Sequence, residues 1–321
     1  MATRFSIVVP VAANGAVPIV PSLDALDYPR DGYEVLVERG ANPSRNRNRA
    51  IARASGDVVA FVDADCVVPP DWLRAADAFL TQRPAWDVVG GPQLTPAADG
   101  FFGRVSGYVL ASRFGAGRMS ARYRRDPVDL HATETSLSSA NLFVRRHVFE
   151  RVGLFDPRLW PNEETELLRR IERGRGRIAH DPAIVVFHHR RPGLRTFAAQ
   201  CFGYGRGRAR QVTVSGERPS LSVLVPSAFL VFVLLLPALL RLSPLWALPL
   251  ALYGATTLLW SAGTAVRRRD AAAMWLLPLV FATIHLAYPA GYVSERIRLW
   301  LGGDVTPRGA DDEVLVRAAS S

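Results

Sequence analysis

Continuous apolar runs alternate with amphipathic stretches over the first third of the chain. Residues 4–11, 33–38 and 58–62 are short runs rich in Val, Leu, Ile and Phe. Runs of this length and composition predict buried β-strands. α-Helices are predicted at residues 45–55, after the turn Asn42-Pro-Ser44, and at residues 71–81, which Pro69-Pro70 opens. Strands of this kind that alternate with helices predict a mostly parallel α/β sheet covered on both faces.

Two acidic residues directly follow the third predicted strand. Asp63 and Asp65 come after the run that ends at residue 62, and a fourth strand is expected at 88–91. Ligands of such sheets bind at the carboxyl ends of the strands. Two carboxylates at that edge suit a divalent cation such as Mg²⁺. The alternative is a turn with two solvated acids. The turn Asn42-Pro-Ser44 is expected to cap the helix at 45–55.

Charged residues become rare after Pro219. From residue 219 to 294 they comprise Arg241, the run Arg267–Arg269 and Asp270. Each of the three apolar stretches between them has the roughly 20 residues that a bilayer-spanning helix needs. These predicted transmembrane helices are residues 219–240, 242–266 and 271–294.

The predicted organisation is a soluble domain of residues 1–218, the apolar region, and a short polar tail of residues 295–321. The first apolar run is too short for a signal peptide. The positive-inside rule then favours a cytoplasmic soluble domain on the inner (plasma) membrane. Three spans would leave the tail outside, whereas Arg296 and Arg298 favour the inside. The third apolar stretch is therefore a span, a re-entrant segment or an irregular segment.

The composition adds a strong positive charge. The 321 residues carry a formal net charge of +10, and all 39 basic residues are Arg. Residues 1–218 hold +8 of this charge. A basic chain can bind nucleic acid, a membrane surface or an anionic substrate. We see no nucleic-acid-binding motif, so nucleic acid is not an expected partner. The two cysteines, Cys66 and Cys201, exclude a disulfide scaffold.

Several segments, taken in order, resemble family-2 glycosyltransferases of the GT-A fold. Arg47–Asp65 resembles their nucleotide-binding half: Arg-Asn, a helix, Ala-x-Gly-Asp, an apolar strand and Asp-x-Asp. The similarity then continues through Ser139–Arg146, Val152–Asp156, Asn162–Ile171, His188–Arg191 and Gln200–Arg208. The last two segments, followed by apolar helices, resemble the membrane-anchored branch that builds succinoglycan-type exopolysaccharides. The resemblance covers most of residues 4–300 and implies a Rossmann-like GT-A domain before a transmembrane region.

The resemblance implies an inverting, metal-dependent transfer. The donor is a nucleotide diphosphate sugar, and the acceptor is a membrane-associated, polyprenyl-linked saccharide. Asp65, with Asp63, is the implied site of Mg²⁺ or Mn²⁺. Glu164 is the implied general base, with Glu163 as its neighbour or alternative. Without the resemblance, these two glutamates are acids suited to the first turn of a helix that Asn162 caps.

Other implied contacts lie on the donor side. Arg47 matches the family's arginine near the base or phosphates, and Pro10 opens the segment where the family has Pro-x-Tyr-Asn-Glu. The acid that meets the nucleotide base is absent from its usual place, and Glu38 is its substitute or a plain surface acid. Arg206 and Arg208 lie where relatives place a Gln-x-x-Arg-Trp motif that contacts the diphosphate. Attraction to the membrane surface is the alternative for these two arginines.

Two other functions remain open at this point. One is a polyprenyl-phosphate glycosyltransferase, whose acceptor is an ionised lipid phosphate that needs no base. The other is a non-catalytic membrane protein whose arginines bind anionic lipid or nucleic acid. For His188 and His189, packing near the acceptor cleft is favoured over metal binding. Residues 100–137 are expected to shape the acceptor site, with a mobile loop at Arg118–Arg125.

Overall fold

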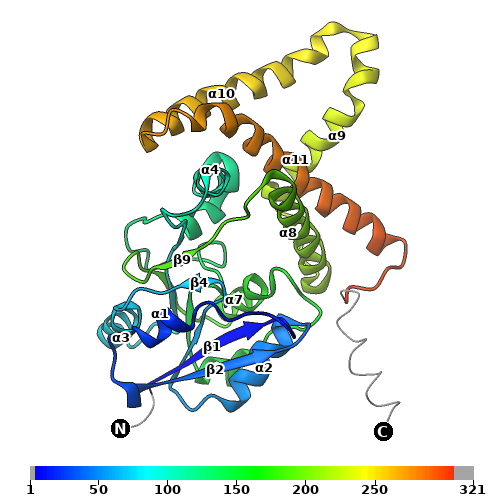
Figure 1. Cartoon of the computed structure of the whole chain (residues 1–321). Helices are drawn as coiled ribbons and strands as arrows, with labels where there is room; N and C mark the ends of the chain where they lie inside the picture. The colour runs from blue at the N-terminus through cyan, green and yellow to red at the C-terminus, as the bar shows by residue number, and fades with distance from the viewer. Residues whose placement is uncertain (1–3, 307–321) are drawn as a thin grey trace. The chain divides into compact units, whose positions relative to one another are not determined.

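The computed structural model describes residues 4–306, which form two compact units (Figure 1). The first unit comprises residues 4–96, 121–189 and 304–306, and the second comprises residues 97–120 and 190–303. The composition of the sequence changes at Pro219, whereas the contacts change near Arg190. The reason is a helix before Pro219 that packs along the last helix of the chain.

The first unit is built on a six-stranded sheet with the order β2-β1-β3-β7-β5-β8. β7 is antiparallel to both of its neighbours, and the other five strands run in one direction. The mostly parallel sheet is therefore confirmed, with one reversed strand in it. The strands are β1 (Phe5–Val11), β2 (Tyr33–Arg39), β3 (Val58–Phe61), β5 (Val88–Gly90), β7 (Leu142–Arg145) and β8 (Ile178–His180).

Successive residues of a strand point to opposite faces of the sheet, so the apolar strands present apolar side chains on both faces. Helices cover both of these faces. Ile7 of β1 packs in a core with Leu73 of α3, and Val8 packs in a second core with Ile51 of α2 and Leu167 of α7. The Asn42 side chain accepts a hydrogen bond from the Arg45 amide at 3.1 Å, so the predicted capping turn supplies its first residue as the cap, and α2 begins at Pro43 rather than Arg45. The helices are α1 (Val20–Asp24), α2 (Pro43–Arg53), α3 (Trp72–Gln82), α6 (His147–Val152) and α7 (Glu163–Arg173).

A small second sheet lies next to the end of β3. It has the order β4-β9-β6, with β4 at Cys66–Val67, β9 at Val186–His188 and β6 at Gln93–Leu94. β4 begins directly after Asp65, and Cys66 lies opposite His188. This pairing brings a segment about 120 residues further along the chain beside the Asp63–Asp65 turn.

The second unit is helical. Its elements are α4 (Phe101–Leu110), α5 (Arg113–Ala116), α8 (Leu194–Ser215), α9 (Leu221–Leu242), α10 (Leu248–Arg268) and α11 (Ala273–Trp300). Within residues 4–306, three helical segments are long and apolar enough to cross a membrane: α9, α10 with its preceding turn, and α11. α11 continues past residue 294 to Trp300, so the start of the predicted polar tail is helical. Residues 307–321 of that tail lie outside the described residues.

Residues 97–120 interrupt the sequence of the first unit and fold with the C-terminal helices. The Tyr108 hydroxyl donates to Asp270 at 3.2 Å, and the Trp260 indole donates to the Ser112 hydroxyl at 2.7 Å. Further along, Nε2 of His285 lies 2.7 Å from the Phe114 carbonyl oxygen. These contacts join α4 and α5 to α10 and α11, an association that the sequence did not predict.

Candidate active site

The carboxyl ends of β1, β2 and β3 meet at one edge of the large sheet, since the three strands are parallel. Asp63 and Asp65 follow β3 at this edge. Pro10, near the end of β1, lies opposite Glu38 of β2. The topology therefore brings these four predicted site residues to the same edge, although they come from three separate segments.

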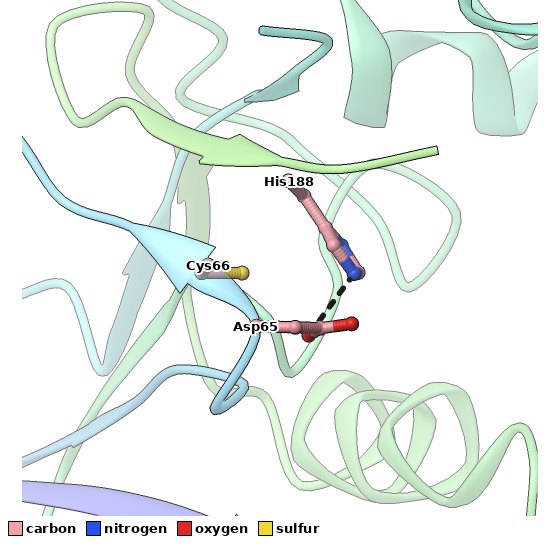
Figure 2. A group of neighbouring side chains, drawn as sticks. All are labelled: Asp65, Cys66 and His188. Carbon is pink, nitrogen blue, oxygen red and sulfur yellow. Dashed lines mark ion pairs between the residues drawn. The ribbon is translucent and has the colours of Figure 1, made fainter. Parts of the chain in front are cut away.

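His188 faces Asp65 across the small sheet (Figure 2). Its Nε2 lies 3.3 Å from Oδ1 of Asp65, and its Nδ1 lies 2.8 Å from Oε1 of Gln93. The Gln93 oxygen accepts a hydrogen bond from Nδ1–H and so fixes the tautomer of the ring. Nε2 is then left to face the carboxylate, either as an imidazolium donor or as a neutral ligand that shares a cation with Asp65.

This arrangement fits a divalent cation. Ligand atoms of Asp65, Cys66 and His188 all lie within 4.8 Å of one another. Carboxylate oxygen and imidazole nitrogen are usual metal ligands, and the nitrogen favours a transition-metal ion such as Mn²⁺ over Mg²⁺. Cys66 is buried in the apolar core, where its thiol lies 4.0 Å from the Ala140 carbonyl. We therefore expect Asp65 and His188, rather than this thiol, to meet the ion.

Arg47 links the Asp63–Asp65 turn to the start of α7. Its guanidinium donates to Glu163 at 2.6 Å and to Asp63 at 3.2 Å, and its charged end lies over the ring of Phe155. Arg47 and Glu163 are each 3% exposed. Arg45 and Arg49, on either side of Arg47 in the sequence, are less buried. The arginine that matches the family pattern is thus the one that faces the site.

Burial raises the pKa of Glu163 to about 7, although Arg47 opposes this shift and Glu164 adds to it. Within the described part of the chain, Oε2 of Glu163 and Nε of Arg47 are buried without a hydrogen-bond partner. Buried polar atoms of this kind are rare in folded proteins and often mark functional sites. Glu163 therefore combines a perturbed carboxyl group with a free hydrogen-bonding position.

Glu164 is held by a different arginine. Nη1 of Arg122 donates to Oε1 of Glu164 at 2.9 Å, and both residues are 7% exposed. The same guanidinium donates to the backbone carbonyls of Glu134 and Thr135 and to the hydroxyl of Thr165. Four hydrogen bonds thus fix the cation beside the implied general base.

The prediction of a mobile loop at Arg118–Arg125 is wrong. Gly117–Tyr123 is a 3₁₀ helix, and Arg122 within it is buried against α7. In the sequence this run of arginines looks like a solvated loop, because the carboxylate that pairs with Arg122 lies 42 residues away and is not visible locally.

Asn162 also differs from expectation. It precedes α7 in a left-handed conformation (φ 86°), and its side chain makes no capping hydrogen bond.

Glu38 is buried and already paired. Its two carboxylate oxygens accept hydrogen bonds from Arg53 at 2.5 Å and Arg49 at 3.2 Å.

In the second unit, Arg206 forms an ion pair with Glu295 at 2.9 Å, and buried Arg208 donates to Gln211 at 2.9 Å. The roles assigned to these residues at the donor remain predictions.

Comparison with known proteins gives one consistent family. A family model described as glycosyl transferase family 2 matches residues 24–153. The Pre-mycofactocin glycosyltransferase of Mycobacterium tuberculosis is 24% identical over 195 residues, which are 60% of this chain and 40% of that protein. The chain therefore aligns with less than half of that relative. The Succinoglycan biosynthesis protein ExoA of Rhizobium meliloti is 28% identical over 263 residues, which are 79% of this chain and 76% of that protein.

A solved structure agrees in fold. The mannosyltransferase PcManGT from Pyrobaculum calidifontis, in complex with GDP-Man and Mn²⁺, matches with a TM-score of 0.55 and 20% identity. The match covers 94% of this chain and 88% of that one. The GT-A-like fold expected from the sequence is thereby confirmed.

Proposed function

The chain is a family-2 glycosyltransferase, and we propose that it moves a sugar from a nucleotide diphosphate sugar to a membrane-associated glycan. The observation that carries this proposal is the Arg47 bridge. One guanidinium joins Asp63, beside the metal-binding candidates, to Glu163, next to the candidate base Glu164. Donor activation and acceptor deprotonation need these two kinds of carboxylate within one site.

The proposed reaction is a single displacement. Glu164 takes the proton of the acceptor hydroxyl as that oxygen attacks the anomeric carbon. The bond from this carbon to the diphosphate oxygen breaks on the opposite face, so the configuration inverts. Arg122 holds Glu164 in position through an ion pair, and Arg47 does the same for Asp63.

Asp65 and His188, with Asp63, would hold Mg²⁺ or Mn²⁺, and the ion would neutralise charge on the leaving diphosphate. On the donor side, Pro10 and Glu38 would flank the nucleoside. Arg206 and Arg208 would contact phosphate oxygens, to which guanidinium groups bind well.

The proposed location is the inner membrane, with the catalytic domain in the cytoplasm. Three apolar helices indicate association with a membrane. The arginines before α9 and at Arg267–Arg269 favour the cytoplasmic side for both. A nucleotide sugar is water-soluble whereas a polyprenyl-linked acceptor is not, so an enzyme at this surface can reach both. ExoA, named for succinoglycan biosynthesis, supports a polysaccharide as the acceptor.

The test is release of nucleoside diphosphate by the purified full-length protein. GDP-, UDP- and dTDP-sugars are supplied with Mn²⁺ or Mg²⁺ and a lipid-linked glycan, beginning with GDP-mannose and Mn²⁺, the ligands of PcManGT. We expect one donor to turn over, and Asp65→Ala to abolish the turnover. Equal rates for the wild type and Asp65→Ala would refute the metal site.

Glu164→Gln separates two acceptor classes. An acceptor hydroxyl must lose a proton, so the variant is expected to lose most activity, about 10²–10⁴-fold. A bare polyprenyl phosphate is already ionised and would not need this base. Full activity of the variant on polyprenyl phosphate would therefore identify a polyprenyl-phosphate glycosyltransferase instead.

A further inference from the structure

The last turns of α11 pack directly against α8, the helix that precedes the first apolar span. A Cβ added at Gly205 of α8 would lie 2.0 Å from the Tyr288 carbonyl oxygen. A Cβ added at Gly291 of α11 would lie 2.0 Å from the Phe202 carbonyl oxygen. The two backbones are therefore in contact, and these glycines permit the close approach.

Ion pairs extend the same contact. Glu295 of α11 is 1% exposed and accepts hydrogen bonds from Arg206 at 2.9 Å and Arg210 at 2.6 Å, both on α8. Beyond it, Arg296 donates to the Thr213 hydroxyl at 2.8 Å. A cluster with this many charges is costly inside the hydrocarbon core. The end of α11 therefore lies on the membrane side where α8 lies.

The start of α11 lies on that side as well, if α9 and α10 span the bilayer as proposed above. α9 begins beside this cluster, where Val223 packs with Tyr292. The chain crosses in α9, turns within residues 243–247 and returns in α10 to Arg267–Arg269. α11 begins a few residues later. A third crossing would place its last turns across the bilayer from α8, which they contact.

We propose that α9 and α10 cross the bilayer and that α11 lies in its surface, with both ends on the α8 side. Figure 1 shows that α9 and α10 diverge from their connection and that α11 runs between their other ends. The partner surface is the boundary between headgroups and acyl chains of the adjacent leaflet. This inference resolves the conflict over Arg296 and Arg298, because both then stay on the cytoplasmic side.

The outer face of α11 has the chemistry of an interfacial helix. Its apolar residues follow one another at spacings of three, four or seven, which places them on one face. They are Trp275, Leu279, Leu286, Val293, Ile297 and Trp300; Leu286 and Val293 are half-buried, and Val293 also packs against the cluster of Val223 and Tyr292. The two tryptophans, near the ends of the helix, are 88% and 84% exposed. Arginines flank both ends, and tryptophan beside arginine is typical of helices at an anionic membrane surface.

Single cysteines test the topology in intact cells. Arg218→Cys marks the side before α9, Leu245→Cys marks the α9–α10 turn, and Leu301→Cys marks the end of α11. Native Cys66 and Cys201 are buried, and burial raises the pKa of Cys201 to about 12, so neither should react. A membrane-impermeant maleimide is applied before and after permeabilisation.

We expect the cysteine at 301 to label as the one at 218 does, and the cysteine at 245 to label oppositely. If the cysteine at 301 labels in the same way as the cysteine at 245, the inference is overturned while the catalytic proposal stays intact. Equal labelling at 218 and 245 would show that α9 and α10 do not form a membrane-spanning hairpin, and would therefore overturn the inference. Neither outcome depends on glycosyltransferase activity.

Depth measurements test the interfacial position. A bimane fluorophore is attached at Leu279→Cys on α11, or at Leu234→Cys on α9 as the matched control; both native leucines are exposed. The protein is reconstituted with lipids that carry a spin label either near the headgroup or near the chain end. We expect shallow labels to quench position 279 more than deep ones, and the reverse at 234. Deeper quenching at 279, or none, would refute the interfacial helix.

Discussion

The guanidinium of Arg47 lies 2.6 Å from the carboxylate of Glu163, and both side chains are almost fully buried. This pair joins α2 to α7 across 116 residues of sequence. Two further carboxylates, Asp63 and Glu164, lie beside it, and Arg122 balances the second. This cluster therefore holds three carboxyl groups and two arginines, so removing either arginine leaves a carboxyl group without its ion-pair partner.

Removing the Arg47 cation is expected to destabilise the protein strongly. Arg47→Met leaves Glu163 buried without a counter-ion, which costs about 3–5 kcal/mol. Arg49→Met is the matched control on the same helix. It removes a half-exposed arginine and should cost less than about 1 kcal/mol. Urea unfolding in detergent, followed by tryptophan fluorescence, measures both. The double variant Arg47→Met/Glu163→Gln should recover part of the loss, and no recovery would contradict the pairing.

Stability is expected to fall as pH rises through the range in which Glu163 titrates. Burial raises its pKa from 4.5 to about 7, so the unfolded chain releases this proton at lower pH than the folded chain. The contribution is fully present below about pH 4.5 and is lost as pH rises towards 7. Glu163→Gln should flatten this slope in thermal unfolding measured at several pH values.

Glu172 provides a comparison for that experiment. Burial and the adjacent Glu134 raise the pKa of Glu172 to about 7 as well, so it acts in the same direction. Because Glu172 is less buried than Glu163, solvent screens it more, and Glu172→Gln should flatten the slope less. A larger effect from Glu172→Gln would show that Glu163 is not the main titrating group.

Local sequence patterns predicted the strands and helices at the sheet edge with little error. The strands expected at 4–11 and 58–62 are Phe5–Val11 and Val58–Phe61, and the Asn42 cap is present. These features depend on apolar runs and on residues a few positions apart. The family pattern likewise assigns roles to Asp65 and Glu164 from short segments, and these roles remain predictions.

Features that depend on distant pairing could not be predicted in this way. Arg122 looked like part of a solvated loop, since its partner Glu164 lies far along the chain. The contact of His188 with Asp65 depends on the pairing of β4 with β9, which are two and three residues long. The packing of Ser112 against Trp260 joins positions 148 residues apart. No local periodicity encodes such contacts.

Arg122 is expected to act through Glu164. Arg122→Gln removes the side chain that fixes Glu164 in position, so kcat should fall while KM for the nucleotide sugar changes little. Arg122→Lys keeps the charge but not the four hydrogen bonds, and should lose less of kcat. An unchanged kcat in Arg122→Gln, with only lower stability, would show a purely structural role.

His188 and its neighbour His189 offer a matched pair for the metal site. His188→Ala should raise the Mn²⁺ concentration for half-maximal activity at least tenfold, whereas His189→Ala, at an exposed position, should change it little. Gln93→Leu removes the partner of Nδ1 and should weaken binding about 10–100-fold, as is usual for residues that orient a ligand. Mn²⁺ binding followed by electron paramagnetic resonance measures affinity without turnover. Equal Mn²⁺ affinity in the wild type and His188→Ala would exclude the histidine as a ligand.

The glycine contacts between α8 and α11 predict where the second unit is least tolerant of added volume. Gly205→Ala and Gly291→Ala each place a methyl group about 2 Å from a carbonyl oxygen of the facing helix, so the helices must separate. Gly203→Ala, on the same helix as Gly205, meets open space and is the control. Separation would weaken the pairing of Glu295 with Arg210. We expect a lower Tm in detergent for the first two variants, and no loss for Gly203→Ala, since alanine favours a helix. Equal Tm values in all three would show that α8 and α11 do not pack this closely.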